Sequence, residues 1–433
     1  MTAEIGILNR TGVALAADSA VTIGSNFSQK VYNSANKLFS LSKQHPVGIM
    51  IYGSANFMGV PWEIIIKEFR KSLKMEKFDS LEEYCTKFFS YMISNDVLLS
   101  QYSEYAQVER VFSSYLIELL NNVNDTIHNL YTEKKITPSE SNVEEVISEK
   151  VEELISVLSE IDTLGNFNDS FIQDFIKVHS TTINQVLSRT IFIPLSEETL
   201  KKFHELATLL FSKNVFSELV SGIVIAGYGE KEVFPSMFEF ETEGMFCGKF
   251  KLIQKGHTVI STEDKEGTSS AAVRAFAQSE MVQMFMHGIA PNMEDMIYNG
   301  LYSTLIEIYP NAIKESIIPE INEEQFSRLS EFGEDVMESF VSNLEEMKNS
   351  QFVRPIVNIV DILPKEELAA MAEALVNLTS FKRKVTIDAE TVGGPIDVAV
   401  ITKGDGFIWI KRKHYFKPEL NYQYFQNIGK GES

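Results

Sequence analysis

Cysteine is almost absent from this sequence of 433 residues, which contains only Cys85 and Cys247. Two cysteines cannot form a disulfide framework, and they are too few for a structural zinc site. The seven histidines are scattered along the chain without the spacing of a metal-binding motif. We therefore expect no bound metal, no cofactor and no redox chemistry.

Long apolar runs and excess positive charge are also missing. No apolar run reaches about 18 residues, and the N-terminus lacks a basic segment followed by an apolar one, so neither a membrane span nor a secretory signal is predicted. Acidic residues outnumber basic ones by 60 to 39, giving a net charge of −21. This excess argues against nucleic acid or an anionic membrane as partner. We expect a soluble, cytoplasmic protein of two or three domains, or of one domain with large insertions.

Glycine is missing between Gly59 and Gly165, and again between Gly165 and Gly222. Because glycine marks turns and weakens helices, these stretches are predicted to be helical. Apolar residues over 143–158 recur at i, i+3 and i+4, which predicts an amphipathic helix. Packing of its apolar face is the expected role, with a coiled-coil partner surface as the alternative. Further helices are predicted over 293–308, 323–349 and 365–380.

Short β-branched runs bounded by turn residues occur where glycine is present, and they predict strands. The predicted strands are 4–8, 13–18, 37–41, 47–52, 222–228, 236–242 and 246–253, with a hairpin over 396–410 around the turn 403–406. The chain therefore alternates strands, helices, strands, helices and strands. A layered α/β sandwich, with helices covering two stacked sheets, would bury all the apolar faces.

The N-terminus reads Met1-Thr2-Ala3. Methionine before a small residue is normally removed, and Thr2 would then carry both a hydroxyl and a free α-amine. An α-amine with a pKa of about 7.7–8.0 can remove the hydroxyl proton, so one residue would supply nucleophile and base.

Four further motifs follow in order. They are Gly12-Val13-Ala14-Leu15-Ala16-Ala17-Asp18, Asn36-Lys37-Leu38-Phe39, the run 47–55 ending in Tyr52-Gly53-Ser54-Ala55, and Gly393-Gly394-Pro395-Ile396-Asp397-Val398-Ala399-Val400-Ile401-Thr402. The run 47–55 is predicted to be a strand that leads through a glycine turn into a helix. Together with Thr2, this set resembles the proteasome β-subunit family of N-terminal-nucleophile hydrolases. The resemblance covers roughly residues 2–95, 218–290 and 363–412.

The resemblance implies an α/β fold, specifically a four-layer αββα sandwich of the N-terminal-nucleophile hydrolase type with added helical insertions. It implies that Thr2 is the nucleophile, that Lys37 lowers the pKa of its hydroxyl, and that Asp18 orients Lys37. The alternative for Lys37 and Asp18 is an ordinary surface ion pair. It further implies that the backbone N–H of Gly53 forms the oxyanion hole.

Residues implied to contact substrate are apolar or uncharged. Thr22 matches a position that pairs with substrate backbone, and the specificity pocket falls on Val21, Ala35, Ile51 and Ala55. The residue before the cleaved bond is therefore expected to be apolar.

Two supporting positions of the family match less well. A serine in a glycine-rich turn that leads into a helix corresponds to Thr268 or Ser269, for which N-capping of that helix is a compatible alternative. An Asp-x-x-Ser before the paired glycines corresponds to Asp388 and Thr391, which are shifted by one residue. Either a one-residue bulge restores this pair, or the pair is lost.

The expected domains are a hydrolase core (1–95, 218–290 and 363–433) and two helical insertions (96–217 and 291–362), which could cap the cleft, block ring stacking or bind a partner protein. The family implies a homo-oligomer, a ring or a dimer. The predicted function is a cytoplasmic threonine peptidase that acts on peptide or protein substrates. The alternatives are a non-peptidase amidase and a catalytically weak or inactive subunit that serves as a scaffold.

Overall fold

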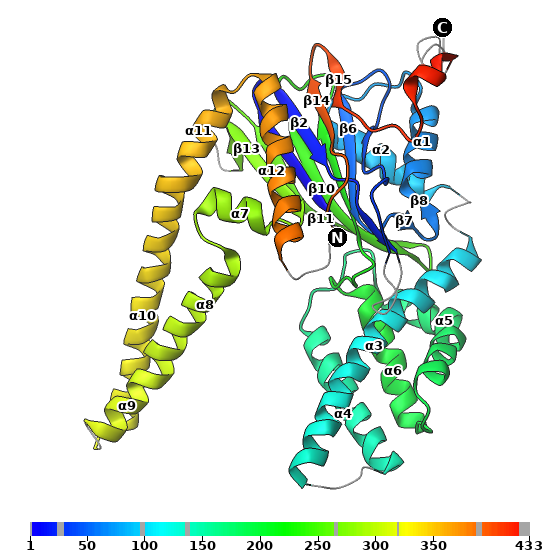
Figure 1. Ribbon diagram of the computed structural model, residues 1–433. Helices are drawn as coiled ribbons and strands as arrows, with labels where there is room; N and C mark the ends of the chain where they lie inside the picture. The colour runs from blue at the N-terminus through cyan, green and yellow to red at the C-terminus, as the bar shows by residue number, and fades with distance from the viewer. Residues whose placement is uncertain are drawn as a thin grey trace. The chain divides into compact units, whose positions relative to one another are not determined.

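The computed structural model describes residues 2–23, 30–95, 100–134, 139–263, 267–317, 320–386 and 392–423 (Figure 1). The chain divides into two compact units. The first unit contains Met1–Leu38, Val233–Pro235 and Thr258–Ser433, and the second contains Phe39–Glu232 and Ser236–His257. This division differs from the expected core and insertions, because each unit combines strands of the core with one of the two helical insertions.

The first unit is built on a five-stranded antiparallel sheet of order β13-β1-β2-β14-β15. Its strands are β1 (Ala3–Asn9), β2 (Gly12–Ala17), β13 (Ala271–Ala277), β14 (Asp397–Thr402) and β15 (Gly406–Lys411). The predicted hairpin around 403–406 is confirmed as the β14–β15 connection. The sheet thus joins strands from the two ends of the chain.

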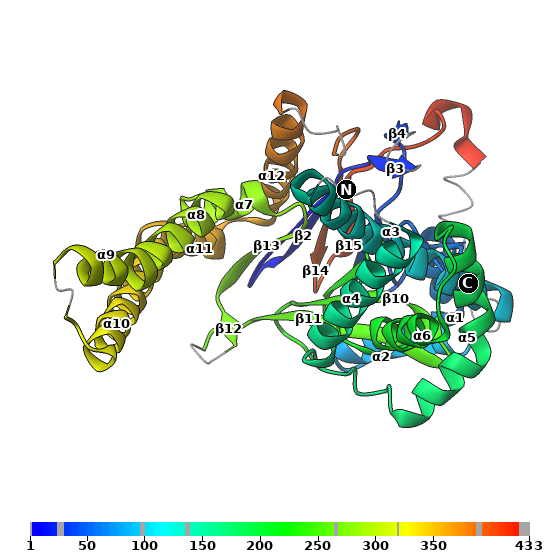
Figure 2. The same cartoon turned by 90° about the horizontal axis from the view of Figure 1, so that it is seen from below.

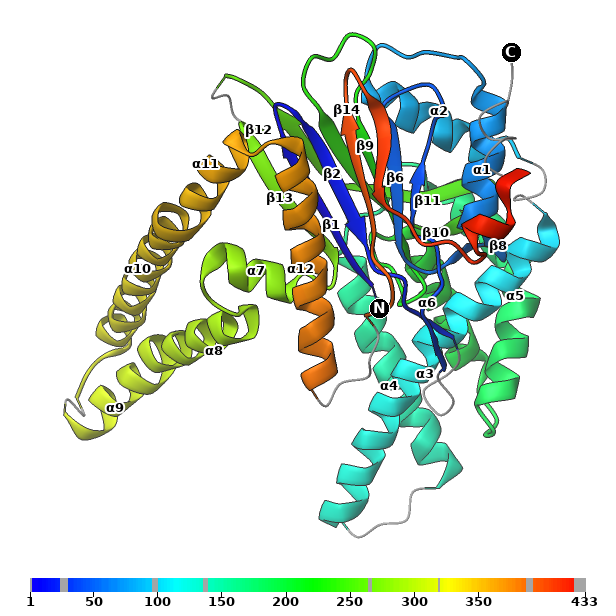
Figure 3. The same ribbon diagram turned by 45° about the horizontal axis from the view of Figure 1, so that its top comes forward.

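One face of this sheet packs against helices α7 (Glu280–His287), α11 (Arg354–Ile362) and α12 (Lys365–Val385). Figure 3 shows α12 along strands β1 and β2. Alternate residues of β1, among them Ala3, Ile5 and Ile7, belong to this core. Since side chains alternate along a strand, Glu4 must point to the opposite face.

The second insertion forms a helical arm in the first unit (Figure 2). It contains α8 (Pro291–Tyr302), π-helical η1 (Ser303–Ile308), α9 (Tyr309–Ser316), α10 (Glu323–Lys348) and π-helical η2 (Asn349–Val353) before α11. The two sides of the arm approach closely at Gly333, where an added Cβ would lie 2.6 Å from the carbonyl oxygen of Leu305. The helices predicted over 293–308 and 323–349 are confirmed.

The second unit contains strands of the other sheet, which has the order β12-β11-β10-β9-β6-β5. The strands are β5 (Leu38–Ser40), β6 (Val47–Gly53), β9 (Ser221–Gly227), β10 (Ser236–Phe246), β11 (Lys249–Ile260) and β12 (Thr268–Ser269). Leu38 of β5, the end of β11 and the whole of β12 lie in the first unit. Helices α1 (Trp62–Leu73) and α2 (Leu81–Ile93) share one hydrophobic core with β6, β9 and β10. Both sheets therefore carry helices, and the stacking of the sheets into four layers stays a prediction.

The first insertion has a core of its own within the second unit. It consists of α3 (Gln101–Lys134), α4 (Glu140–Ser159), α5 (Asp169–Thr190) and α6 (Glu197–Ser212). Phe171, Phe175 and Phe211 are fully buried in it. The helix predicted over 143–158 is α4, and its apolar residues Ile147 and Val151 pack in this core. Packing is therefore the role of that apolar face.

Two local predictions are wrong. The strand ending at Gly53 does not run directly into a helix, because a short hairpin of β7 (Asn56–Phe57) and β8 (Val60–Pro61) precedes α1. Its turn residues Met58 and Gly59 have φ angles of 48° and 87°, which no helix accommodates. No helix follows Ser269 either. Strand β13 follows instead, because Ala271–Ala277 pairs with β1 along its whole length, and this tertiary pairing overrides the helix propensity of its alanines.

No helix within the described ranges is long and apolar enough to cross a membrane.

Candidate active site

Thr2, Asp18 and Lys37 all lie in the first unit, next to strand ends. Thr2 directly precedes β1 and Asp18 directly follows β2. Because β1 and β2 form an antiparallel hairpin, these two residues come to the same end of the sheet, where the N–H of Asp18 donates to the carbonyl of Ala3 at 3.1 Å. Lys37 directly precedes β5.

The Lys37 ammonium joins the other two side chains. Its Nζ donates to Thr2 Oγ1 at 3.0 Å and to Asp18 Oδ1 at 2.6 Å. All three residues are buried, with exposed fractions of 4% for Thr2, 1% for Asp18 and 6% for Lys37. Lys37 and Asp18 are therefore not a surface ion pair.

Backbone N–H groups fix the Asp18 carboxylate. Oδ1 also accepts from the N–H of Ala3 at 3.1 Å. Oδ2 accepts from the N–H groups of Ala20 at 3.1 Å and of Gly393 at 3.0 Å. These donors hold the orientation of the carboxylate, and that in turn fixes the direction from which Lys37 approaches Thr2.

Burial and charge act against each other on Lys37. Burial lowers the pKa of its ammonium, while the charge and hydrogen bond of Asp18 act to raise it. An ammonium that donates to a hydroxyl oxygen in a buried place stabilises the negative charge that develops when the hydroxyl is deprotonated. The arrangement can thus activate Thr2 as a nucleophile.

Glu4, which sequence reasoning missed, is a second buried carboxyl group near this site. It is fully buried, and neither of its carboxylate oxygens has a hydrogen-bond partner among the described residues. Burial raises the pKa of Glu4 to about 8; the Lys37 charge acts to lower the pKa and the Asp18 charge to raise it. Glu4 is therefore mostly neutral at pH 7. The signal in the sequence was a single glutamate within an otherwise apolar run, Ala3-Glu4-Ile5-Gly6-Ile7-Leu8.

The backbone of Thr2 is held by the segment that follows β13. The N–H of Gln278 donates to the carbonyl of Thr2 at 3.1 Å. The next residue, Ser279, is the N-cap of α7, and its hydroxyl accepts from the side-chain amide of Gln283 at 3.0 Å. A serine thus stands at a turn into a helix beside Thr2, which sequence reasoning also missed.

Thr268 and Ser269 lie elsewhere, which corrects their assignment to that turn. In the β1–β13 register Ala277 opposes Ala3, whereas Ala271 opposes Asn9. Thr268 and Ser269 precede Ala271, so they lie near the far end of β1, which is about 24 Å from Thr2 at 3.4 Å per residue. Their hydroxyls donate locally, to the carbonyls of Glu263 and Ala271 respectively.

The remaining predicted residues are spread over the two units. Val21 lies on strand β3 (Val21–Ile23), as does Thr22, which opposes Val31 of β4 (Lys30–Tyr32). Ala35 is half-buried, and its N–H donates to the carbonyl of Ser19 at 3.1 Å. Asp388 and Thr391 lie outside the described residues.

Three of the predicted positions belong to the second unit, so their proximity to Thr2 stays a prediction. Gly53 is exposed with a φ of 75°, and an added Cβ would lie 2.3 Å from the carbonyl oxygen of Val220. Ala55 is exposed. Ile51 is only 5% exposed and belongs to the core formed with α1 and α2, so it is not an open pocket wall.

Comparison with protein-family models and with curated proteins finds no match. Among solved structures, the chain is similar to "Anbu (Gly-1) mutant from Hyphomicrobium sp. strain MC1". The sequence identity is 10%, the alignment covers 100% of this chain and 99% of that chain, and the TM-score is 0.24.

Proposed function

We propose that the chain is an N-terminal-threonine hydrolase that cleaves peptide bonds through Thr2, once Met1 has been removed. The observation that carries this proposal is the buried contact of Lys37 Nζ with both Thr2 Oγ1 and Asp18 Oδ1. A buried lysine needs a carboxylate partner, and Asp18 provides it. A lysine held against a threonine hydroxyl next to a chain terminus has a chemical use that a structural ion pair lacks.

The proposed reaction has two halves. The free α-amine of Thr2 takes the hydroxyl proton as Oγ1 attacks the carbonyl carbon of the substrate. The tetrahedral intermediate collapses when that proton passes to the leaving amine, which breaks the C–N bond and leaves an ester on Thr2. Water, deprotonated by the same amine, then attacks the ester, the C–Oγ1 bond breaks to release the acid, and the amine returns the proton to Oγ1. Lys37 stabilises the negative charge on Oγ1 in both halves.

Gly53 is proposed to donate its backbone N–H to the carbonyl oxygen of the substrate. Its exposure and its left-handed backbone, which would place a side chain against Val220, support this role. Val21, Thr22, Ala35 and Ala55 are proposed to contact the substrate chain, with an apolar residue before the cleaved bond. Peptide rather than small-amide substrates, and assembly into a homo-oligomer, follow from the family resemblance.

Intact mass spectrometry tests the nucleophile directly. The purified chain is measured before and after treatment with a β-lactone, which acylates an activated N-terminal threonine. We expect the loss of Met1 and a single adduct that peptide mapping places on Thr2. The matched control is Thr11→Ala, which removes an exposed threonine hydroxyl from the β1–β2 turn and should leave the adduct intact, whereas Thr2→Ala should abolish it.

Two results would contradict the proposal. One is a chain with a free Thr2 amine that forms no adduct, and the other is an adduct that persists in Thr2→Ala. Either result would favour the scaffold alternative, in which the same fold binds or assembles without turnover.

A further inference from the structure

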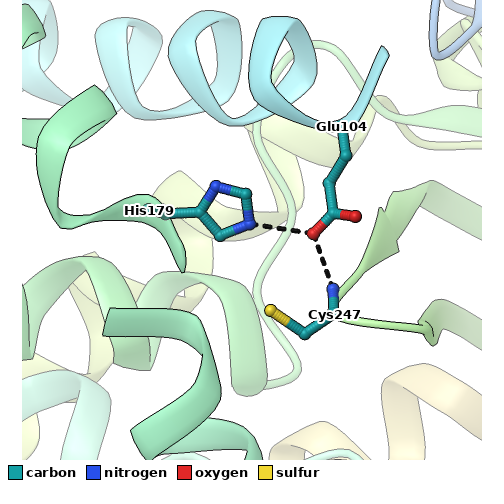
Figure 4. Close-up of side chains that lie close together, drawn as sticks. All are labelled: Glu104, His179 and Cys247. Atoms are coloured by element: carbon teal, nitrogen blue, oxygen red, sulfur yellow. Dashed lines mark hydrogen bonds and ion pairs between the residues drawn. The ribbon is translucent and has the colours of Figure 1, made fainter. Parts of the chain in front are cut away.

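A second cluster of reactive side chains lies in the second unit, and the proposed function does not use it. Glu104 comes from α3, His179 from α5 and Cys247 from the turn between β10 and β11 (Figure 4). One ligand atom from each residue lies within 4.8 Å of the other two. Figure 4 shows the imidazole, the carboxylate and the thiol turned toward a common space.

The cluster is held together by hydrogen bonds on one oxygen. Glu104 Oε1 lies 2.8 Å from His179 Nε2 and accepts from the backbone N–H of Cys247 at 2.7 Å. His179 is fully buried, and its Nδ1 has no partner among the described residues. Cys247 has a φ of 48° in the tight turn before Gly248, so the hairpin fixes the direction of its Cα–Cβ bond.

We propose that Glu104, His179 and Cys247 bind one divalent transition-metal ion of the zinc type, with a water molecule in the fourth position. The donor set of one nitrogen, one oxygen and one sulfur suits this class of ion. Bond lengths of about 2.0–2.3 Å put neighbouring ligands of a tetrahedral ion roughly 3.5 Å apart. The distance between His179 Nε2 and Glu104 Oε1 would therefore have to increase from 2.8 Å when the ion binds.

Binding would change the protons of the cluster in a defined way. The Cys247 thiol loses its proton to solvent, because the thiolate is the ligand. The imidazole binds through Nε2, so its remaining proton moves to Nδ1. The net change is the release of one proton for each ion bound, with no oxidation or reduction. The ion would link α3, α5 and the β10–β11 hairpin. In the sequence, Glu104 and His179 are 75 residues apart, and His179 and Cys247 are 68 residues apart.

Cobalt binding by the full-length chain tests the site. Titration of metal-free protein with Co²⁺ should produce a thiolate-to-cobalt charge-transfer band that saturates at one equivalent. Zn²⁺ should then remove the band, because it competes for the same ligands. Cys247→Ser keeps the size of the side chain and removes the thiolate, so it should abolish the band and weaken Zn²⁺ binding by at least about 100-fold.

Cys85→Ala is the matched control, because it removes the other cysteine of the chain and should leave the band unchanged. His179 is fully buried, so substitutions there risk unfolding and are not needed. The absence of any band in the wild type, or an equal band in Cys247→Ser, would overturn the proposal. The role of the cluster would then be structural, through the hydrogen bonds of Glu104 with His179 and with the backbone of Cys247.

The metal proposal is independent of the proposed hydrolase. Thr2 belongs to the first unit and none of the three ligands does. Thr2→Ala should therefore bind Co²⁺ as the wild type does, and this result separates failure of one proposal from failure of the other.

Discussion

Each of the two units contains a buried pair of a lysine and a carboxylate. Lys37 and Asp18 are 2.6 Å apart in the first unit, and Lys251 and Glu243 are 2.8 Å apart in the second. Burial lowers the pKa of both lysines, and the partner carboxylate opposes that shift in each case. By burial and electrostatics alone, the two pairs are alike.

Their other neighbours differ. Lys251 also donates to the carbonyl of Leu210 at 2.7 Å and lies 5.0 Å from the ring centroid of Phe216. Glu243 accepts from the N–H of Ser217 at 2.7 Å. None of these groups is a nucleophile, so this pair links β10 and β11 to the segments around them. Lys37 instead donates to a threonine hydroxyl. The chemistry of the third group, rather than the pKa shift, singles out the candidate site.

Replacing Lys37 should give the largest effect. We expect Lys37→Met to slow acylation of Thr2 by a β-lactone about 10²–10⁴-fold, because the charge that stabilises the Thr2 oxyanion is lost. The rate is measured by intact mass against time, on protein whose folding is checked by circular dichroism. A folded variant that reacts at the wild-type rate would place Lys37 among the structural lysines.

Lys251→Met should lower the stability of the protein and leave the acylation of Thr2 unchanged. Removal of the cation leaves Glu243 buried without a counter-charge, so we expect the free energy of unfolding to fall by about 3–5 kcal/mol. Urea titration measures this loss. Thr2 in the folded fraction should be acylated at the wild-type rate, and a slower rate would mean that the two pairs are coupled.

Glu4 should make stability depend on pH. Its pKa is about 8 in the folded protein against an ordinary value of 4.5, so the folded state keeps a proton that the unfolded chain loses between these values. The free energy of unfolding should therefore fall as pH rises from about 4.5 to 8, by up to about 1.4 kcal/mol per pH unit from this group.

Glu4→Gln cannot lose that proton, so it should remove this contribution. Urea titrations of both proteins at pH 5, 6, 7 and 8 measure the difference, which should favour Glu4→Gln increasingly as pH rises. A difference that stays constant with pH would show that Glu4 ionises normally in the folded protein.

The smallest effect is expected for an exposed pair. Arg10 contacts Asp361 through two hydrogen bonds, of 3.0 and 2.5 Å, and its side chain is 40% exposed. Solvent screens such a pair, so Arg10→Ala should cost no more than about 1 kcal/mol. Thermal unfolding at low and high salt would check this, and a loss as large as that of Lys251→Met would contradict it.

Local patterns in the sequence predicted most of the elements. Alternation and β-branching identified β1, β2 and β9, and the 3.6-residue period identified α4, because these signals depend on neighbouring residues. The contact of Lys37 with Thr2 and Asp18 followed from the family resemblance, which brought together motifs that the chain keeps apart.

The parts of the fold and of the site that the sequence did not reveal depend on contacts between residues far apart in the chain. Whether residues 271–277 form a helix or a strand is decided by their pairing with β1, and Gln278 reaches Thr2 through the same pairing. The three potential metal ligands carry no spacing motif, because three different elements supply them. Glu4 was overlooked because only the packed sheet removes it from water.

Strand β2 pairs with β14, which the ribosome makes much later than β2. Asp397 of β14 opposes Ala17 of β2, and the N–H of Gly393 holds the Asp18 carboxylate. These contacts join residues 380 and 375 positions apart, so a chain still on the ribosome cannot form them until residues 393–397 have emerged. At about 5–20 residues per second, synthesis of the intervening chain takes tens of seconds. Until then the Asp18 carboxylate lacks the Gly393 N–H that holds it, so the contact of Lys37 with Asp18 and Thr2 reaches its final form only late in synthesis.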